Sequence, residues 1–166
     1  MAKGQAVPRE LAIKQALRVL TTIQPFCERV PVVAGSIRRL RPTVHDIDIV
    51  AQADPAQMVR MAVALTAVVD PGTLKLAPKI WHAMMNGITL DLYLADAKSY
   101  GMLVLVRTGS PAHNIKLASL AKRQGMRLHF DGYVEVQGKE PIWCAEEDQV
   151  FSALGLDFVA PELREA

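Results

Sequence analysis

Two short blocks of the sequence carry carboxylates that could bind a metal ion. Residues 46–51 read DIDIVA, so Asp46 and Asp48 alternate with apolar residues. Side chains alternate along a strand, which places both carboxylates on one face. Residues 88–93, ITLDLY, present Asp91 in the same way. If the two strands are neighbours, three carboxylates converge, and their repulsion predicts a hard divalent cation, Mg²⁺ or Mn²⁺.

A candidate phosphate-binding turn precedes the first block. Gly35 has no side chain, so backbone N–H groups can approach a phosphate there, and Ser36 adds a hydroxyl donor. One arginine of the pair Arg38–Arg39 can add a guanidinium fork that matches phosphate oxygens. A D-x-D pair alone is common on solvent-facing strands, but turn, cation and paired carboxylates together predict a metal–triphosphate site. His45, one residue before the pair, is expected to face away from it.

The composition is that of a protein with a substantial hydrophobic core. The 166 residues suffice for one domain, or for one plus a small appendage, and 51% are hydrophobic. No apolar run approaches the ~20 residues of a membrane helix, and the start lacks the apolar stretch of a signal peptide. Cys27 and Cys144 lack metal-ligand spacing, which suits a reducing compartment. We therefore expect a cytoplasmic or otherwise intracellular protein, cellular or virus-encoded, with no membrane partner.

Charge is distributed unevenly, although the net charge is only +2. Residues 97–130 contain six basic residues and no acidic residue: Lys98, Arg107, Lys116, Lys122, Arg123 and Arg127. Such a block can follow a nucleic-acid phosphate backbone, or it can be a solvated helix face. Charge alone supports the two interpretations equally.

Apolar periodicity and turn signals predict a mixture of helices and strands. Helices are expected at 8–25, 54–68, 96–106, 110–125 and 146–154, and strands at 30–34, 46–51, 79–85, 88–95, 126–130 and 133–136. Asn86-Gly87 is a strong hairpin signal. Trp81 and Trp143 have no basic–aromatic alternation nearby and are expected in the core. The elements indicate an α+β fold: a mixed β-sheet with flanking helices up to about residue 106, then a smaller α/β unit.

Two motifs resemble a known family. G-S-x-R-R followed by D-I-D-I-V resembles the nucleotidyltransferase signature of the family X DNA polymerases, the DNA polymerase beta group. Residues 108–128, TGSPAHNIKLASLAKRQGMRL, are similar to the T-G-S-x-x-x-N thumb motif of these enzymes, and the final segment VFSALGLDFVAPELRE is similar to their C-terminal segment. The resemblance runs from about Val7 to Glu165. It implies a nucleotidyltransferase palm domain over residues 1–106 and a thumb domain over 107–166.

The resemblance also implies roles for individual residues. Asp46, Asp48 and Asp91 match the aspartates that bind two metal ions. Ser36 and Arg39 match residues that hold the β- and γ-phosphates, Gly35 allows their close approach, and Arg38 is interpreted as structural. In the thumb, the turn Thr108–Gly109–Ser110 matches the turn that lies against the nucleotide sugar, and Asn114 matches the asparagine at the base. We expect DNA contacts from Arg107, Lys116, Lys122, Arg123 and Arg127.

The implied activity is gap-filling DNA polymerisation of the repair type, by a monomer acting on DNA and a dNTP. Val106 and Arg107 replace the family's usual aromatic pair before T-G-S, which affects the choice between ribose and deoxyribose. Ala118 replaces an arginine that contacts the template strand, which affects fidelity. An amino-terminal lyase region is not expected. Two alternatives remain: a nucleotidyltransferase acting on a small molecule or a protein, and a catalytically weak DNA-end-binding module.

Overall fold

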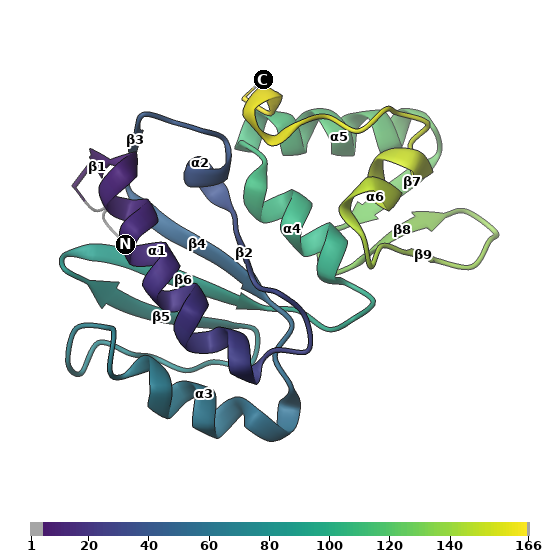
Figure 1. Ribbon diagram of the computed structural model, residues 1–166. Coiled ribbons are helices and arrows are strands. Elements are labelled where there is room, and N and C mark those ends of the chain that lie inside the picture. Colours follow the sequence, from purple (N-terminus) through teal and green to yellow (C-terminus); the bar gives the residue numbers. More distant parts are fainter. Residues whose placement is uncertain (1–4, 166) are drawn as a thin grey trace.

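The computed structural model describes residues 5–165, and its first part is built on a four-stranded sheet (Figure 1). The strands lie in the order β2 (Val32–Val33), β4 (Asp46–Ala51), β6 (Ile88–Leu94) and β5 (Ile80–Met85). Strands β4 and β6 are parallel, whereas β2 and β5 run antiparallel to their neighbours. The predicted mixed sheet is therefore confirmed, although β2 is shorter than the expected strand at 30–34.

One face of this sheet packs against helices α1 (Arg9–Ile23) and α3 (Met58–Leu65). The side chains that β4 and β6 direct to this face are apolar and buried: Ile47, Ile49, Leu90 and Leu92. Burial of these side chains leaves the alternating positions, which include the aspartates, on the opposite face. The alternation predicted for 46–51 is thus confirmed.

The opposite face is only partly covered. Helix α4 (Tyr100–Thr108) packs against it through an apolar cluster that joins Val104 to Val50 and Tyr93. The short helix α2 (Gly35–Arg38) follows β2 at the same face. Helix α4 continues across residue 106, and its Met102 and Leu105 pack into a separate core. The division into palm and thumb at residue 106 stays a prediction.

The second part of the chain surrounds that separate core. It contains α5 (Pro111–Arg123), β7 (Met126–His129), β8 (Tyr133–Val136), β9 (Ile142–Trp143) and α6 (Glu147–Ala153). The three strands form an antiparallel sheet in the order β7-β8-β9. The predicted helices and hairpin are confirmed here, but β9 was not predicted. Trp143 is 45% exposed on this third strand, so its predicted core position is wrong, whereas Trp81 is buried as expected.

The remaining elements are short. Strands β1 (Val7–Pro8) and β3 (Thr43–Val44) pair with each other, and 3-10 turns lie at η1 (Gln24–Phe26), η2 (Pro55–Gln57) and η3 (Pro161–Leu163). The predicted helix at 54–68 begins as η2, where Asp54 accepts a hydrogen bond from the backbone N–H of Ala56, and continues as α3. Within residues 5–165, no helix combines the length and apolarity needed to cross a membrane.

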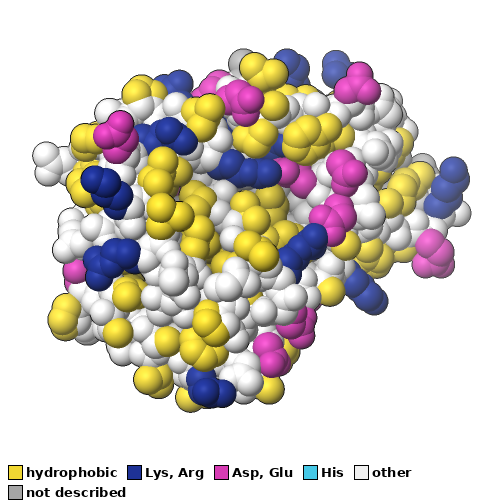
Figure 2. Space-filling view, in the orientation of Figure 1, with side chains coloured by type: hydrophobic (Ala, Val, Ile, Leu, Met, Phe, Trp, Pro, Cys, Tyr) yellow, Lys and Arg dark blue, Asp and Glu magenta, His cyan; other side chains and the backbone are white. Residues whose placement is uncertain are grey.

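Charged side chains of both signs meet where the two parts join, over α2 and α6 (Figure 2). Ion pairs cross this junction, among them Arg29 with Glu146 and Arg38 with Glu147. Because Arg38 belongs to α2 and Glu147 to α6, the second pair links α2 to the second part of the protein.

Candidate active site

The predicted phosphate turn and two of the aspartates line one cleft of about 420 Å³. The lining residues are Gly35, Ser36, Arg39, Arg41, Thr43, His45, Asp46, Asp48, Arg107, Gly109 and Glu165. His45 therefore does not face away from the pair. It lies in a bend between β3 and β4, where the alternation of a strand does not apply. The cleft holds cationic and anionic side chains together.

The three aspartates form one electrostatic site. Asp48 and Asp91 are direct partners in the parallel register of β4 and β6, and Asp46 lies two residues before Asp48 on the same face. Burial, followed by the negative charges of Asp46 and Asp91, raises the pKa of Asp48 to about 7. The Tyr93 hydroxyl and the Arg107 guanidinium oppose this rise. A divalent cation would relieve the repulsion that remains.

Asp91 is held by two neighbours on the sheet. His82, its cross-strand partner on β5, places Nδ1 2.6 Å from Asp91 Oδ1, and the Tyr93 hydroxyl lies 3.5 Å from Oδ2. As they stand, no three His, Cys, Asp or Glu side chains among residues 5–165 are grouped to hold a metal ion. The carboxylate oxygens of Asp46, Asp48 and Asp91 are ligands that suit Mg²⁺ or Mn²⁺. One oxygen of Asp91, however, already contacts His82.

Gly35 brings the phosphate turn against the carboxylates. Its φ is +57°, and a Cβ atom there would lie 1.9 Å from Oδ2 of Asp48, closer than any real contact. The backbone N–H of Ala34 donates to the carbonyl of Asp48 at 2.8 Å, which joins the turn to β4. Ser36 presents a buried hydroxyl with no hydrogen-bond partner among the described residues. A buried hydroxyl without a partner is uncommon, and a phosphate oxygen would satisfy it.

Replacing Gly35 with alanine should destabilise the fold more than replacing Gly72 does. Both glycines have positive φ values, +57° and +71°, so alanine strains either backbone by about 1–2 kcal/mol. Only Gly35→Ala also drives a methyl group into Asp48, because nothing lies within 4 Å at Gly72. We expect a total loss of about 3 kcal/mol for Gly35→Ala in urea unfolding, against about 1–2 for Gly72→Ala. Equal losses of stability in the two variants would show that a methyl group at residue 35 does not clash with Asp48.

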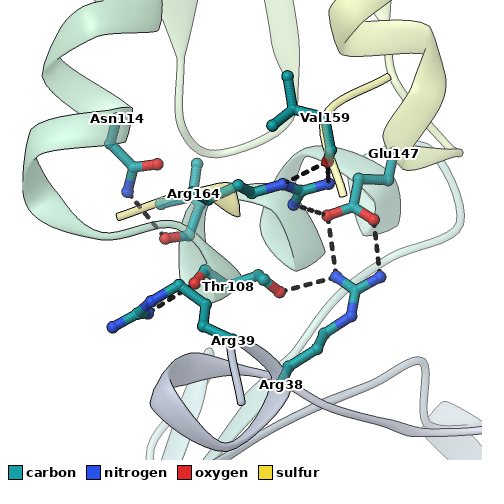
Figure 3. A network of polar contacts seen from close by, with 8 residues as sticks. Arg38, Arg39, Thr108, Asn114, Glu147, Val159 and Arg164 are labelled. Carbon is teal, nitrogen blue, oxygen red and sulfur yellow. Dashed lines mark hydrogen bonds and ion pairs between the residues drawn. The ribbon is translucent and has the colours of Figure 1, made fainter. Parts of the chain in front are cut away.

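Arg38, interpreted from the sequence as structural, belongs to a partly buried network of polar contacts (Figure 3). Its guanidinium donates to both carboxylate oxygens of Glu147, at 2.9 and 2.8 Å, and to Thr108 Oγ1 at 2.8 Å. Glu147 also pairs with Arg164, whose side chain is completely buried and donates to the carbonyl of Val159. The Glu147 carboxylate thus forms ion pairs with two arginines from different parts of the chain.

Thr108, the first residue of the predicted sugar turn, contacts Arg38 and Arg39, which follow the predicted phosphate turn. Thr108 is fully buried and accepts a hydrogen bond from Arg39 through its carbonyl at 2.7 Å. Gly109 lines the cleft, and Ser110 is buried at the start of α5. Asn114 donates to the carbonyl of Val106 at 2.9 Å, while its buried Oδ1 has no partner among the described residues. Whether these residues contact a nucleotide stays a prediction.

The predicted DNA-binding residues occupy two places. Four are exposed on α5 and β7: Lys116, Lys122, Arg123 and Arg127. Arg107 is instead in the cleft, where its guanidinium lies 4.1 Å from the ring centroid of Tyr93. Arg107 therefore lines the same cleft as Asp46 and Asp48, whereas the other four predicted DNA-binding residues lie on α5 and β7.

Several contributors to the site were not predicted, among them Tyr93, His82, Glu147 and Glu165. Tyr93 follows Asp91 by two residues, so strand alternation could have placed it on the carboxylate face. His82 could have been found from the hairpin register about Asn86-Gly87. Nothing local indicated Glu147 or Glu165, which meet their arginines only through the tertiary fold.

Comparison with known proteins agrees with this geometry. Residues 103–165 match the family model of the DNA polymerase beta thumb. The chain is also 28% identical, over 168 residues, to the DNA polymerase/3'-5' exonuclease PolX of Bacillus subtilis (strain 168). That similarity covers 96% of the chain and 29% of the relative, so the chain spans less than a third of the relative's length. Both similarities support the resemblance to the family X polymerases that the sequence motifs indicated.

Proposed function

We propose that the chain is a DNA-directed DNA polymerase of the gap-filling, repair type, with a nucleotidyltransferase palm over residues 1–106 and a thumb over 107–166. The observation that carries the proposal is the common cleft. It joins a glycine–serine turn, whose buried Ser36 hydroxyl has no partner among the described residues, to Asp46 and Asp48, and the pKa of Asp48 is raised by burial and by the charges of Asp46 and Asp91. The family X relationship suggests polymerase activity, and the matched thumb supports DNA as the partner.

In the proposed reaction, the 3′-hydroxyl oxygen of a primer attacks the α-phosphorus of a dNTP. The bond between the α-phosphorus and the oxygen that bridges to the β-phosphate breaks, the hydroxyl proton is released to water, and pyrophosphate departs. Ser36 and Arg39 would hold the β- and γ-phosphates, while Asp46, Asp48 and Asp91 would hold two divalent cations. Such ions, when bound, stabilise the entering and leaving oxygens. The protein's own contribution is positioning and charge, with Asp91 assigned to the primer hydroxyl.

The proposed thumb completes the substrate site. The turn Thr108–Gly109–Ser110 would lie against the sugar, Asn114 would touch the base, and the exposed basic residues of α5 and β7 would contact the DNA backbone. The partnerless Oδ1 of Asn114 supports its assignment, because a buried acceptor without a donor favours a ligand there. We assign Arg107 to the substrate side of the cleft, beside Tyr93.

One assay tests the proposal against its alternatives. A labelled dNTP or ATP is supplied with Mg²⁺, either with gapped DNA or with no DNA. Extension that requires DNA, and that stops on addition of EDTA, is the expected result. Transfer without DNA would indicate a nucleotidyltransferase for small molecules or proteins. DNA binding without extension would indicate an end-binding module.

A further inference from the structure

The arginine assigned to the phosphates already holds an anion of the protein itself. Arg39 donates from Nε to Oε1 of Glu165 at 2.8 Å, while another nitrogen of its guanidinium donates to the carbonyl of Thr108 at 2.7 Å. Arg41 adds a second, more distant cation, with its Nε 3.9 Å from the same carboxylate oxygen. Glu165 therefore lines the cleft together with Ser36 and Asp48.

The backbone of Glu165 is anchored independently of its carboxylate. The Ser110 hydroxyl donates to the carbonyl of Glu165 at 3.0 Å, and the Ser110 N–H donates to the carbonyl of Arg164 at 3.1 Å. Arg164 is itself buried in the network with Glu147. The Glu165 side chain is 37% exposed, whereas that of Arg39 is 13% exposed. The carboxylate can thus turn into solvent by side-chain rotation while the backbone stays in place.

We propose that Glu165 is an internal competitor for the phosphate position. Its carboxylate neutralises Arg39 in the free protein, and a nucleotide must displace it to bind. A ligand can bind Arg39 only in the fraction of molecules in which the carboxylate has left it, so the apparent affinity is reduced by that fraction. Glu165 therefore weakens the binding of every phosphate ligand at Arg39 by the same factor. This inference rests on the proposed role of Arg39 in phosphate binding.

The proposal is tested by replacing Glu165 with glutamine and measuring the binding of inorganic tripolyphosphate by calorimetry, with EDTA and without DNA. We expect Glu165→Gln to tighten binding about tenfold, the equivalent of removing one charge-assisted competitor. Orthophosphate binding should tighten by the same factor. Glu162→Gln is the matched control, because Glu162 is exposed nearby and its replacement changes the net charge equally. It should leave both affinities unchanged.

Steady-state kinetics separates this role from a structural one. Glu165→Gln should lower the KM for dNTP about tenfold and leave kcat within about twofold, since the carboxylate is displaced before reaction. Unchanged or weaker tripolyphosphate binding by Glu165→Gln, relative to Glu162→Gln, would overturn the inference. A protein that never extends DNA but shows the tightened binding would retain the inference and lose the proposed polymerase function. DNA extension by a protein whose tripolyphosphate binding is unaltered by Glu165→Gln would retain the proposed polymerase function and overturn the inference about Glu165.

Discussion

Replacing Asp48 with asparagine should abolish nucleotide transfer and stabilise the metal-free fold. The substitution removes the central carboxylate of the proposed metal site, so incorporation into gapped DNA should fall at least about a thousandfold, equivalent to about 4 kcal/mol of transition-state stabilisation. It also removes a charge that the native protein accommodates poorly, because burial, Asp46 and Asp91 raise its pKa to about 7. Function and stability should therefore change in opposite directions.

The pH dependence has a definite sign. The pKa of Asp48 is higher in the folded protein than in the unfolded chain, so between about pH 4 and pH 7 the folded state binds more protons. Stability from this group is present below about pH 4 and is lost as the pH rises to about 7. In EDTA, Asp48→Asn should match the wild type near pH 4 and exceed it by about 2–4 kcal/mol at pH 8.

Urea unfolding at the two pH values, together with a primer-extension assay, checks this prediction. Asp157→Asn is the control, because Asp157 is exposed and far along the chain from the carboxylate cluster. It should change neither activity nor the pH profile. If Asp48→Asn retained near-normal incorporation, the assignment of the carboxylates would be wrong. If it were destabilising at pH 8, the electrostatic account of the cluster would fail.

Replacing Glu147 with alanine should cause a large loss of stability. The carboxylate pairs with both Arg38 and Arg164, and the Arg164 side chain is completely buried. Its removal leaves a buried guanidinium with no counter-charge, a defect that typically costs about 3–5 kcal/mol. The loss should be specific to this residue of α6 and should also loosen α2, since Arg38 loses its bidentate partner.

Asp148→Ala provides the comparison for this second prediction. Asp148 is the next residue of α6 and is exposed, so its replacement should cost less than about 1 kcal/mol, mainly through the helix dipole. Chemical unfolding of both variants measures the difference. Hydrogen exchange of the backbone amides at 35–39 should rise in Glu147→Ala and not in Asp148→Ala. Similar free energies of unfolding for the two variants would mean that the network around Glu147 contributes little to the stability of the fold.

Much of the fold follows from local pattern. Alternation determined strand 46–51 and placed Asp46 and Asp48 on one face, because the direction of a side chain depends only on its position along the strand. Asn86-Gly87 determined the hairpin, since both residues adopt the positive φ values that its turn requires. Ser110 and Gly125 likewise set the two ends of α5 through a side-chain cap and a left-handed backbone.

Only the tertiary structure decided which distant groups share the site. From the sequence, Asp91 could be placed beside Asp48 only if their two strands were neighbours. The parallel pairing of β4 with β6 makes them neighbours. Glu147 lies 109 residues from Arg38, and Glu165 lies 126 residues from Arg39. No local pattern encodes such separations. The fold brings these charges together because burying the cores on both sides of α4 positions the chain segments that carry them.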